Sequence, residues 1–184
     1  MNELYEAVRA KDSARVQALV DADPSLAIFA AAMQGDHARV EQLLAANRSL
    51  ISAVSPDGWT PLHLAAFFGG ADAARALLNK GASPSARSTN AMQNLPLHAA
   101  AAGRHADLVK LLIEHGSPVD ARQHGGWTAL HAAALKGYDK VVQFLADHGA
   151  NLSARDVLGR TALDWAQENE NSEMADLIRA WLKK

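Results

Sequence analysis

The feature that most constrains the fold of this chain is an internal repeat. One eight-letter pattern recurs four times along the 184 residues, as WTPLHLAA at 59–66, NLPLHAAA at 94–101, WTALHAAA at 127–134 and RTALDWAQ at 160–167. Glycines recur downstream with the same spacing, at Gly81, Gly116 and Gly149, which are 35 and 33 residues apart. Because two independent markers keep one period, the chain consists of consecutive copies of a single supersecondary unit.

Each copy encodes two short helices. Thr60, Thr128 and Thr161 are favourable N-cap residues, and a proline follows the cap position in two copies, where a helix needs no N–H. A second helix is predicted from apolar residues at i, i+3 and i+4. The repeated glycines allow the left-handed backbone that ends this helix, with Asn47 as the equivalent in an earlier copy. Helices this short are marginal alone, so neighbouring pairs must cover their apolar faces.

A helix pair with an extended turn, about 33 residues long and with a T-P-L-H start, resembles the ankyrin repeat. The resemblance implies an all-α fold: an α-solenoid of stacked ankyrin-type helix pairs with projecting turns, about six units including two degenerate caps. A single domain, 1-184, is expected, with units at about 2-25 (N-cap), 26-57, 58-92, 93-125, 126-158 and 159-184 (C-cap). The motif histidine is replaced by Phe29 in the second unit and by Asp164 in the last.

Composition argues against several classes of function. Eighteen Lys and Arg against twenty Asp and Glu leave a net charge of −2, so neither nucleic acid nor an anionic membrane is an expected partner. Cysteine is absent, which excludes disulfides, thiol catalysis and cysteine zinc sites. The amino terminus has no secretory signal pattern, and the longest apolar run is far shorter than the roughly 20 residues of a membrane span. We therefore expect a soluble, cytoplasmic protein.

Three histidines, His63, His98 and His131, recur in register. Stacked helices lie roughly 8–10 Å apart, whereas imidazoles that share a zinc ion each lie about 2.0–2.1 Å from it. Adjacent repeat histidines therefore cannot share an ion, and the resemblance implies that they hydrogen-bond the turn backbone. The scattered histidines, such as His37 and His105, are expected in solvent. No known catalytic motif occurs, so we predict no enzyme, no metal and no cofactor, although an unrecognised catalytic site is a third hypothesis.

A second series consists of Arg87, Arg122 and Arg155, each of which follows an alanine at the base of an extended turn. One interpretation is a stripe that binds phosphate or an acidic partner. The other is that these arginines are solvated, or paired with nearby aspartates. Three arginines on a nearly neutral protein are few for nucleic-acid binding.

The resemblance also suggests where a partner binds. In ankyrin repeats the turn and the first helix of each unit form a concave face that binds partners, and the residue before the threonine and those ending the first helix face solvent. At such positions and beside them lie the candidate partner-binding residues Trp59, Phe67, Phe68, Asn94, His124, Trp127, Leu135 and Lys136. The equivalent Met33 is expected to be exposed as well. Contiguous exposed apolar groups mark interaction sites, and Trp is enriched at binding hot spots.

We predict a non-enzymatic protein-protein interaction module that binds a polypeptide partner through its concave face. Two alternatives stay open. The same apolar patch could join copies of the chain into a homo-oligomer. The turn between Gly81 and Leu95, two residues longer than its counterpart, could instead fold Met92 over Phe67 and Phe68 and bury them as a local lid.

Overall fold

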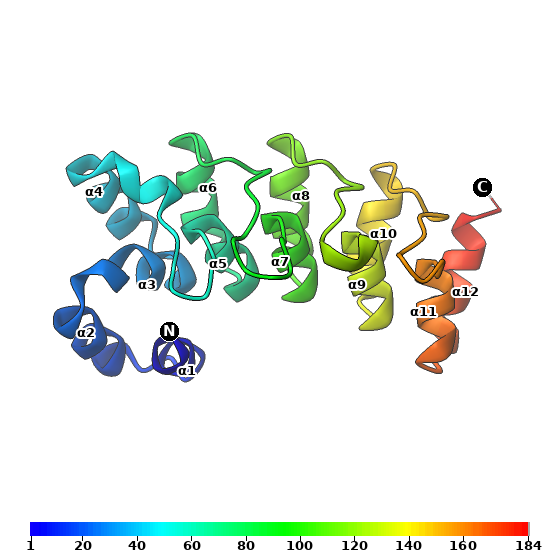
Figure 1. Cartoon of the computed structure of the whole chain (residues 1–184), viewed down its shortest axis with the longest axis horizontal. Coiled ribbons are helices and arrows are strands. Elements are labelled where there is room, and N and C mark those ends of the chain that lie inside the picture. The colour runs from blue at the N-terminus through cyan, green and yellow to red at the C-terminus, as the bar shows by residue number, and fades with distance from the viewer. Residues whose placement is uncertain (184) are drawn as a thin grey trace.

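A computed structural model describes residues 1–183, and helices and turns account for its regular structure, with no strand among those residues. The α-helices are α1 (Asn2–Arg9), α2 (Ser13–Ala22), α3 (Ala27–Gln34), α4 (His37–Ala46), α5 (Pro61–Phe68), α6 (Ala71–Asn79), α7 (Pro96–Ala102), α8 (Ala106–Glu114), α9 (Ala129–Leu135), α10 (Asp139–Asp147), α11 (Ala162–Glu168) and α12 (Ser172–Trp181). Short 3-10 helices are η1 (Pro24–Leu26), η2 (Arg48–Ser52) and η3 (His124–Gly126). The predicted all-α solenoid is confirmed (Figure 1).

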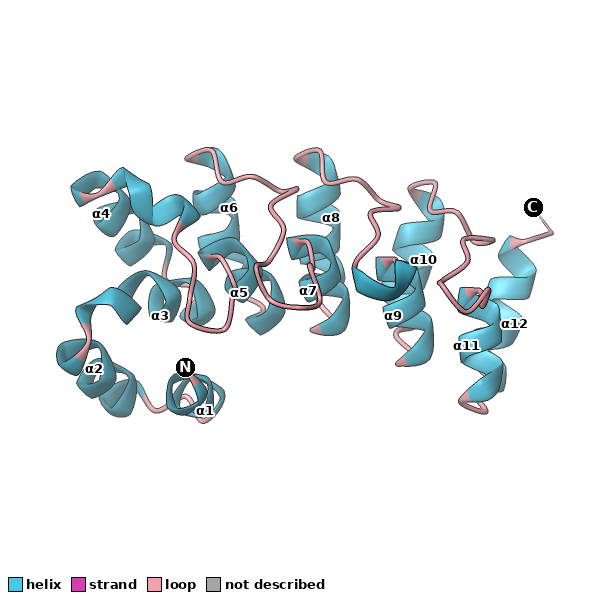
Figure 2. Cartoon of the chain, viewed as in Figure 1, coloured by secondary structure: helices cyan, strands magenta, loops and turns pink. Residues whose placement is uncertain are grey.

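The helices from α3 onward stand in two rows. The odd-numbered helices α3 to α11 form an inner row and the even-numbered helices α4 to α12 form an outer row, and each helix contacts the next one in its row. Four long turns, at 53–60, 82–95, 117–128 and 150–161, project beside the inner row (Figure 2). We call them fingers 1 to 4. The surface formed by the fingers and the inner row is the inner face.

One hydrophobic core runs through all the units. Alanines such as Ala65, Ala100 and Ala133 are fully buried in the inner row, where their small side chains allow neighbouring helices to approach closely. Leucines from both rows fill the remaining space, and Leu97 and Leu112 have no exposed surface. Each buried leucine contributes roughly 1.5–3 kcal/mol relative to an exposed one, so stacking stabilises helices that are too short to be stable alone.

The ends of the outer helices follow the prediction with one exception. Gly81, Gly116 and Gly149 adopt φ values of 95°, 88° and 81°, as the left-handed helix ends require. The prediction for Asn47 is wrong, because its φ is −148° and its side chain caps η2 by accepting a hydrogen bond from the Ser49 N–H. At this point the chain continues into a 3-10 helix, and no left-handed residue is needed.

The first helix pair is arranged differently from the others. Only η1 and its flanking residues link α2 to α3, so the chain has no length for a finger at this point. Both α1 and α2 pack against α3. Figure 1 shows the pair displaced from the two rows, with α1 next to the inner helices. This displacement brings α1 side chains to the inner face.

Candidate partner-binding site

The recurrent T-P-L-H start fixes the ends of the inner helices. The Thr60 hydroxyl oxygen accepts a hydrogen bond from the His63 N–H, and Nδ1 of His63 accepts one from the Thr60 N–H, which forms a reciprocal capping box. Thr161 with Asp164 repeats the arrangement, whereas Thr128 keeps the bond from its N–H to Nδ1 of His131 but its side chain caps no backbone N–H. All three threonines therefore occupy the predicted N-cap position, Thr60 and Thr161 cap through their side chains, and an aspartate replaces the motif histidine in the last unit.

The motif histidines also join consecutive units. Since Nδ1 accepts a backbone N–H, the proton is on Nε2, which donates to a carbonyl in the next finger. These bonds run from His63 to Asn94 (2.9 Å), from His98 to Ala121 (2.9 Å) and from His131 to Arg160 (3.2 Å). The structural role that the resemblance implies for these histidines is confirmed, because both ring nitrogens form hydrogen bonds with backbone groups.

Burial controls the charge of these histidines. His63 and His98 are 0% and 2% exposed. Loss of hydration disfavours the imidazolium form and lowers the pKa of each to about 4, although the bonds to carbonyls act in the opposite direction. Burial lowers the pKa of His131 as well. The motif histidines are thus neutral structural connectors at neutral pH.

An aromatic group lies at the N-terminal end of the inner face. Phe67 and Phe68, at the end of α5, contact each other edge to face with ring centres 5.4 Å apart, and Trp59 of finger 1 lies 6.3 Å from Phe67. Tyr5 of α1 completes the group, at 5.5 Å from Phe68. All four side chains are partly buried. We call them the N-terminal aromatic cluster.

Tyr5 is a member that sequence reasoning missed. Its hydroxyl donates a hydrogen bond to the carboxylate of Asp57 in finger 1, which ties α1 to a residue 52 positions away. Burial, together with the negative charge of Asp57, raises the pKa of Tyr5. The guanidinium of Arg9 lies 5.4 Å from the centre of the Phe68 ring. No repeat spacing relates α1 to these residues, so the sequence offered no signal.

The local-lid alternative is not what the structure shows. Phe67 and Phe68 are partly exposed rather than fully buried; Tyr5 and Arg9 contact Phe68, and Trp59 contacts Phe67. Met92 is 46% exposed at the tip of finger 2. Its backbone carbonyl accepts a hydrogen bond from the His124 N–H, which draws the longer turn toward finger 3 instead.

Two expected surface residues are buried. Asn94 is only 9% exposed, since its backbone pairs with Ser88 inside finger 2 and its carbonyl accepts from His63. Its side-chain Oδ1 is buried without a hydrogen-bond partner. Met33 is 3% exposed and lies with Val8 of α1 on the wall of one cleft. The expectations that Asn94 is an exposed partner-binding residue and that Met33 is exposed are therefore wrong.

A second aromatic group lies toward the C-terminus. The ring of Trp127, in finger 3, packs 4.6 Å from that of Trp165 in α11, and Arg160 stacks on Trp165 at 3.5 Å. The Trp165 indole donates to the buried carboxylate of Asp156. We call Trp127, Trp165 and Arg160 the C-terminal aromatic cluster. Trp165 was also missed, although an aromatic residue where other units have Leu or Ala was a usable signal.

The remaining candidate partner-binding residues are Leu135, Lys136 and His124. Leu135 is partly buried at the end of α9, and Lys136 beside it is exposed. His124 is exposed at the tip of finger 3, as expected. His105, expected in solvent, instead bonds through Nε2 to the Phe67 carbonyl at 3.1 Å, because the end of α5 lies next to the start of α8.

The arginine series is part of the scaffold. Arg87 donates to the Gln93 carbonyl in its own finger and to the Arg122 carbonyl in the next one. Arg122 likewise donates to the carbonyls of Gly126 and Arg155. The acceptors are backbone oxygens rather than the aspartates considered from the sequence. Arg87 and Arg122 therefore link consecutive fingers, whereas Arg155 donates to the Gly159 carbonyl in its own finger.

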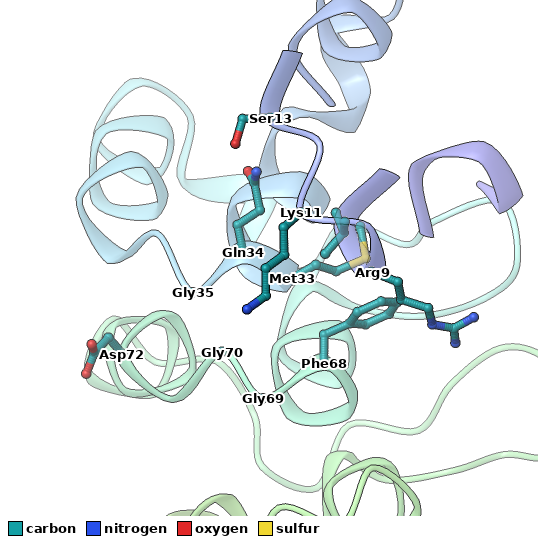
Figure 3. Close-up of a pocket in the computed structure, with 11 residues that line it drawn as sticks. Arg9, Lys11, Ser13, Met33, Gln34, Gly35, Phe68, Gly69, Gly70 and Asp72 are labelled. Carbon is teal, nitrogen blue, oxygen red and sulfur yellow. The ribbon is translucent and has the colours of Figure 1, made fainter. Parts of the chain in front are cut away.

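A cleft opens near α1. It has a volume of about 590 Å³ and lies between the α1–α2 turn and the turns that follow α3 and α5. Figure 3 shows Lys11 extending into it, with Arg9 next to Phe68. Asp72 is the one carboxylate among its lining residues, which include no histidine.

Comparison with known proteins agrees with this architecture. A family model for ankyrin repeats, three copies long, matches residues 4–88 and again 97–180. The chain belongs to the ankyrin repeat family. Ankyrin repeats are generally protein-protein interaction modules and are typically non-enzymatic.

Two curated proteins are similar to part of this ankyrin repeat chain. The Neurogenic locus Notch protein of Drosophila melanogaster is 36% identical over 92 residues, which are 50% of this chain and 3% of Notch. The Serine/threonine-protein kinase VIK of Arabidopsis thaliana is 36% identical over 85 residues, or 46% of this chain and 19% of the kinase. The matched segments are therefore a small part of either relative.

Two further observations concern other classes of site on this ankyrin repeat structure. Within residues 1–183, no three His, Cys, Asp or Glu side chains form a group that could hold a metal ion. None of the helices in those residues combines the length and the apolar composition that a bilayer span requires.

Proposed function

We propose that this chain is a non-enzymatic interaction module that binds a polypeptide partner through the concave face formed by its fingers and inner helices. The observation that carries the proposal is the pair of partly exposed aromatic clusters on the inner face, one around Trp59 and one around Trp127. Tryptophan and arginine are the side chains that most often dominate binding energy at interfaces.

The spacing of the two aromatic clusters suggests how a partner segment is recognised. The unit at 93–125 lies between them and contributes no aromatic side chain. A partner segment lying along the inner face would meet two apolar anchor points separated by this unit. At the N-terminal cluster α1 already covers part of Phe68, so the partner would reach it through Trp59 and Phe67.

The test compares partner capture by three proteins: the unchanged chain, the Trp59→Ala, Trp127→Ala double variant, and Phe144→Ala. Phe144 is a partly buried aromatic residue on the outer row, stacked on His148, and serves as the matched control. The proposal expects the double variant to lose partners that Phe144→Ala retains, with at least about 2 kcal/mol lost per hot-spot residue, or roughly thirtyfold in affinity.

Unfolding free energies must accompany the binding data, because both tryptophans are half-buried and their removal also lowers stability. Equal capture by the double variant and the control would refute binding through the inner face. Sedimentation over a concentration series checks the alternative. Self-association abolished by the same double variant would assign the aromatic clusters to a homo-oligomer contact instead.

A further inference from the structure

A small pocket opens within the N-terminal aromatic cluster, between α1, finger 1 and α5. Its volume is about 90 Å³, and its walls are formed by Tyr5, Arg9, Trp59, Leu64, Phe67 and Phe68. An engineered apolar cavity of roughly 150 Å³ holds a benzene ring. The smaller pocket on this chain therefore has room for one aliphatic side chain rather than for an aromatic ring.

Arg9 is the one charged residue in the wall of this pocket. It is exposed, and its guanidinium lies 5.4 Å from the centre of the Phe68 ring. Within residues 1–183 Arg9 forms no ion pair. Asp57, the acidic residue of finger 1, already accepts hydrogen bonds from the hydroxyls of Tyr5 and Ser55. The positive charge beside the pocket is therefore left without a carboxylate partner in this part of the chain.

The C-terminal aromatic cluster shows how such an arginine can be paired. Cζ of Arg160 lies 3.5 Å from the centre of the Trp165 ring. Nη1 of the same guanidinium donates to the Glu168 carboxylate at 2.8 Å. A guanidinium that stacks on a ring keeps the N–H groups in its plane available for carboxylate oxygens, so one arginine can bind both. Arg9 has the ring but lacks the carboxylate.

The pocket and the cleft near α1 share two wall residues, Arg9 and Phe68. Figure 3 shows Arg9 and Asp72 at opposite sides of the cleft, with Lys11 between them. Among the described residues Lys11 has no ion-pair partner either. Two cations and one carboxylate line the cleft, so the charge of this surface favours an anionic partner.

We propose that the pocket and Arg9 bind a polypeptide segment in which an aliphatic side chain is flanked by acidic residues. The aliphatic side chain enters the pocket, and a flanking carboxylate accepts hydrogen bonds from Arg9, as Glu168 does from Arg160. Lys11 attracts further acidic residues of the segment toward the cleft. This inference rests on the proposed function, because the pocket is part of the N-terminal aromatic cluster, and it adds the chemistry of the partner.

The probe is the synthetic peptide acetyl-Glu-Glu-Leu-Glu-Glu-amide, titrated into the isotope-labelled full chain. Saturable NMR shifts are expected at the Trp59 indole and at the amides of Arg9, Phe67 and Phe68, with a dissociation constant of about 1 mM or lower. A peptide with glutamine in place of the four glutamates loses the carboxylates, and one with alanine in place of leucine loses the side chain that fills the pocket. Each should bind about fivefold more weakly or worse.

Two protein variants separate Arg9 from the general charge of the chain. Arg9→Gln should weaken binding of the acidic peptide about fivefold or more and leave binding of the glutamine peptide unchanged. Arg104→Gln is the matched control, because Arg104 is also exposed and its guanidinium lies 5.2 Å from the centre of the Tyr138 ring, away from the aromatic pocket. It removes the same charge and should leave binding of both peptides unchanged.

Equal binding of the acidic and glutamine peptides, equal effects of the two variants, or no saturable shift below about 5 mM peptide would overturn the proposal. The same shifts caused by inorganic phosphate alone would identify a general anion site and also contradict it. Arg9→Gln keeps Trp59 and Trp127. A partner that is captured by Arg9→Gln as by the unchanged chain, but not by the double tryptophan variant, would support the proposed function and refute this inference alone.

Discussion

Nε2 of His63 in α5 donates a hydrogen bond to the backbone carbonyl of Asn94, 31 residues further along the chain, at a distance of 2.9 Å. The same ring caps its own helix through Nδ1, so one side chain secures both the start of a unit and its contact with the next. The His63 imidazole must be neutral for Nδ1 to accept a hydrogen bond. The stability of the stacked units is therefore sensitive to protonation of this ring.

Stability should therefore fall as the pH is lowered from about 6.5 to 4. The pKa of His63 and of His98 is about 4 in the folded chain, against roughly 6.5 in an unfolded chain. Between these values the unfolded state binds more protons, so stability is complete above pH 6.5 and is lost toward pH 4. Urea unfolding should show a slope of about 2–3 kcal/mol per pH unit near pH 5 for the two histidines together.

A His98→Gln variant provides the control, because glutamine does not titrate. Its unfolding free energy is lower at pH 7, but its slope near pH 5 should be smaller by about 1.4 kcal/mol per pH unit. Asp164 affects stability in a different pH range. Hydrogen bonds from the Thr161 N–H and hydroxyl lower the pKa of Asp164, so the stability that its carboxylate contributes is lost only as the pH falls below the usual carboxyl range. An unchanged slope in His98→Gln would refute the assignment.

Replacing Tyr5 with Phe should destabilise the chain by about 1 kcal/mol, because the change removes the hydrogen bond to Asp57 and keeps the ring against Phe68. Tyr138→Phe is the matched control, as its hydroxyl has no hydrogen bond within residues 1–183. Urea midpoints should move for Tyr5→Phe alone. Similar shifts for both variants would show that the Tyr5–Asp57 bond does not hold α1 on the inner face.

Arg122→Ala should cost more stability than Arg155→Ala. The Arg122 guanidinium bonds to two carbonyls in two fingers, whereas that of Arg155 bonds to one carbonyl in its own finger. Each hydrogen bond from an arginine side chain to a backbone carbonyl contributes about 0.5–1.5 kcal/mol, so the two variants should differ in unfolding free energy by about that amount. Thermal or urea unfolding measures it. Equal losses would mean that the link between fingers adds nothing to stability.

Substitutions at two glycines distinguish the cost of a steric clash from the cost of an unfavourable backbone conformation. A Cβ on Gly70 would lie 2.4 Å from the Ala32 carbonyl oxygen, so Gly70→Ala must push two neighbouring turns apart and should cost about 1–3 kcal/mol or more. A Cβ on Gly116 meets nothing within 4 Å, but its φ of 88° is unfavourable for alanine. Gly116→Ala should cost only about 1–2 kcal/mol, the penalty of that backbone conformation. Equal unfolding free energies would contradict the predicted order.

The sequence by itself determined the repeat, the helix pairs and most of the capping. These depend on residues close together in the chain, such as Thr60 with His63, or on a period repeated in every unit. It also located the two tryptophans and two phenylalanines that lie in the aromatic clusters, because their positions within the unit determine which face they occupy.

Only the tertiary structure decided what covers those residues. The short η1 link displaces α1, which brings Tyr5 to Phe68 and Asp57, and no local rule relates residues more than 50 positions apart. The burial of Asn94 likewise follows from how finger 2 closes on itself. Two of the arginine acceptors, the carbonyls of Arg122 and Arg155, belong to the next finger, so these bonds exist only once the units have stacked. Local chemistry specifies a unit, whereas contacts between units depend on the lengths of the links that place them.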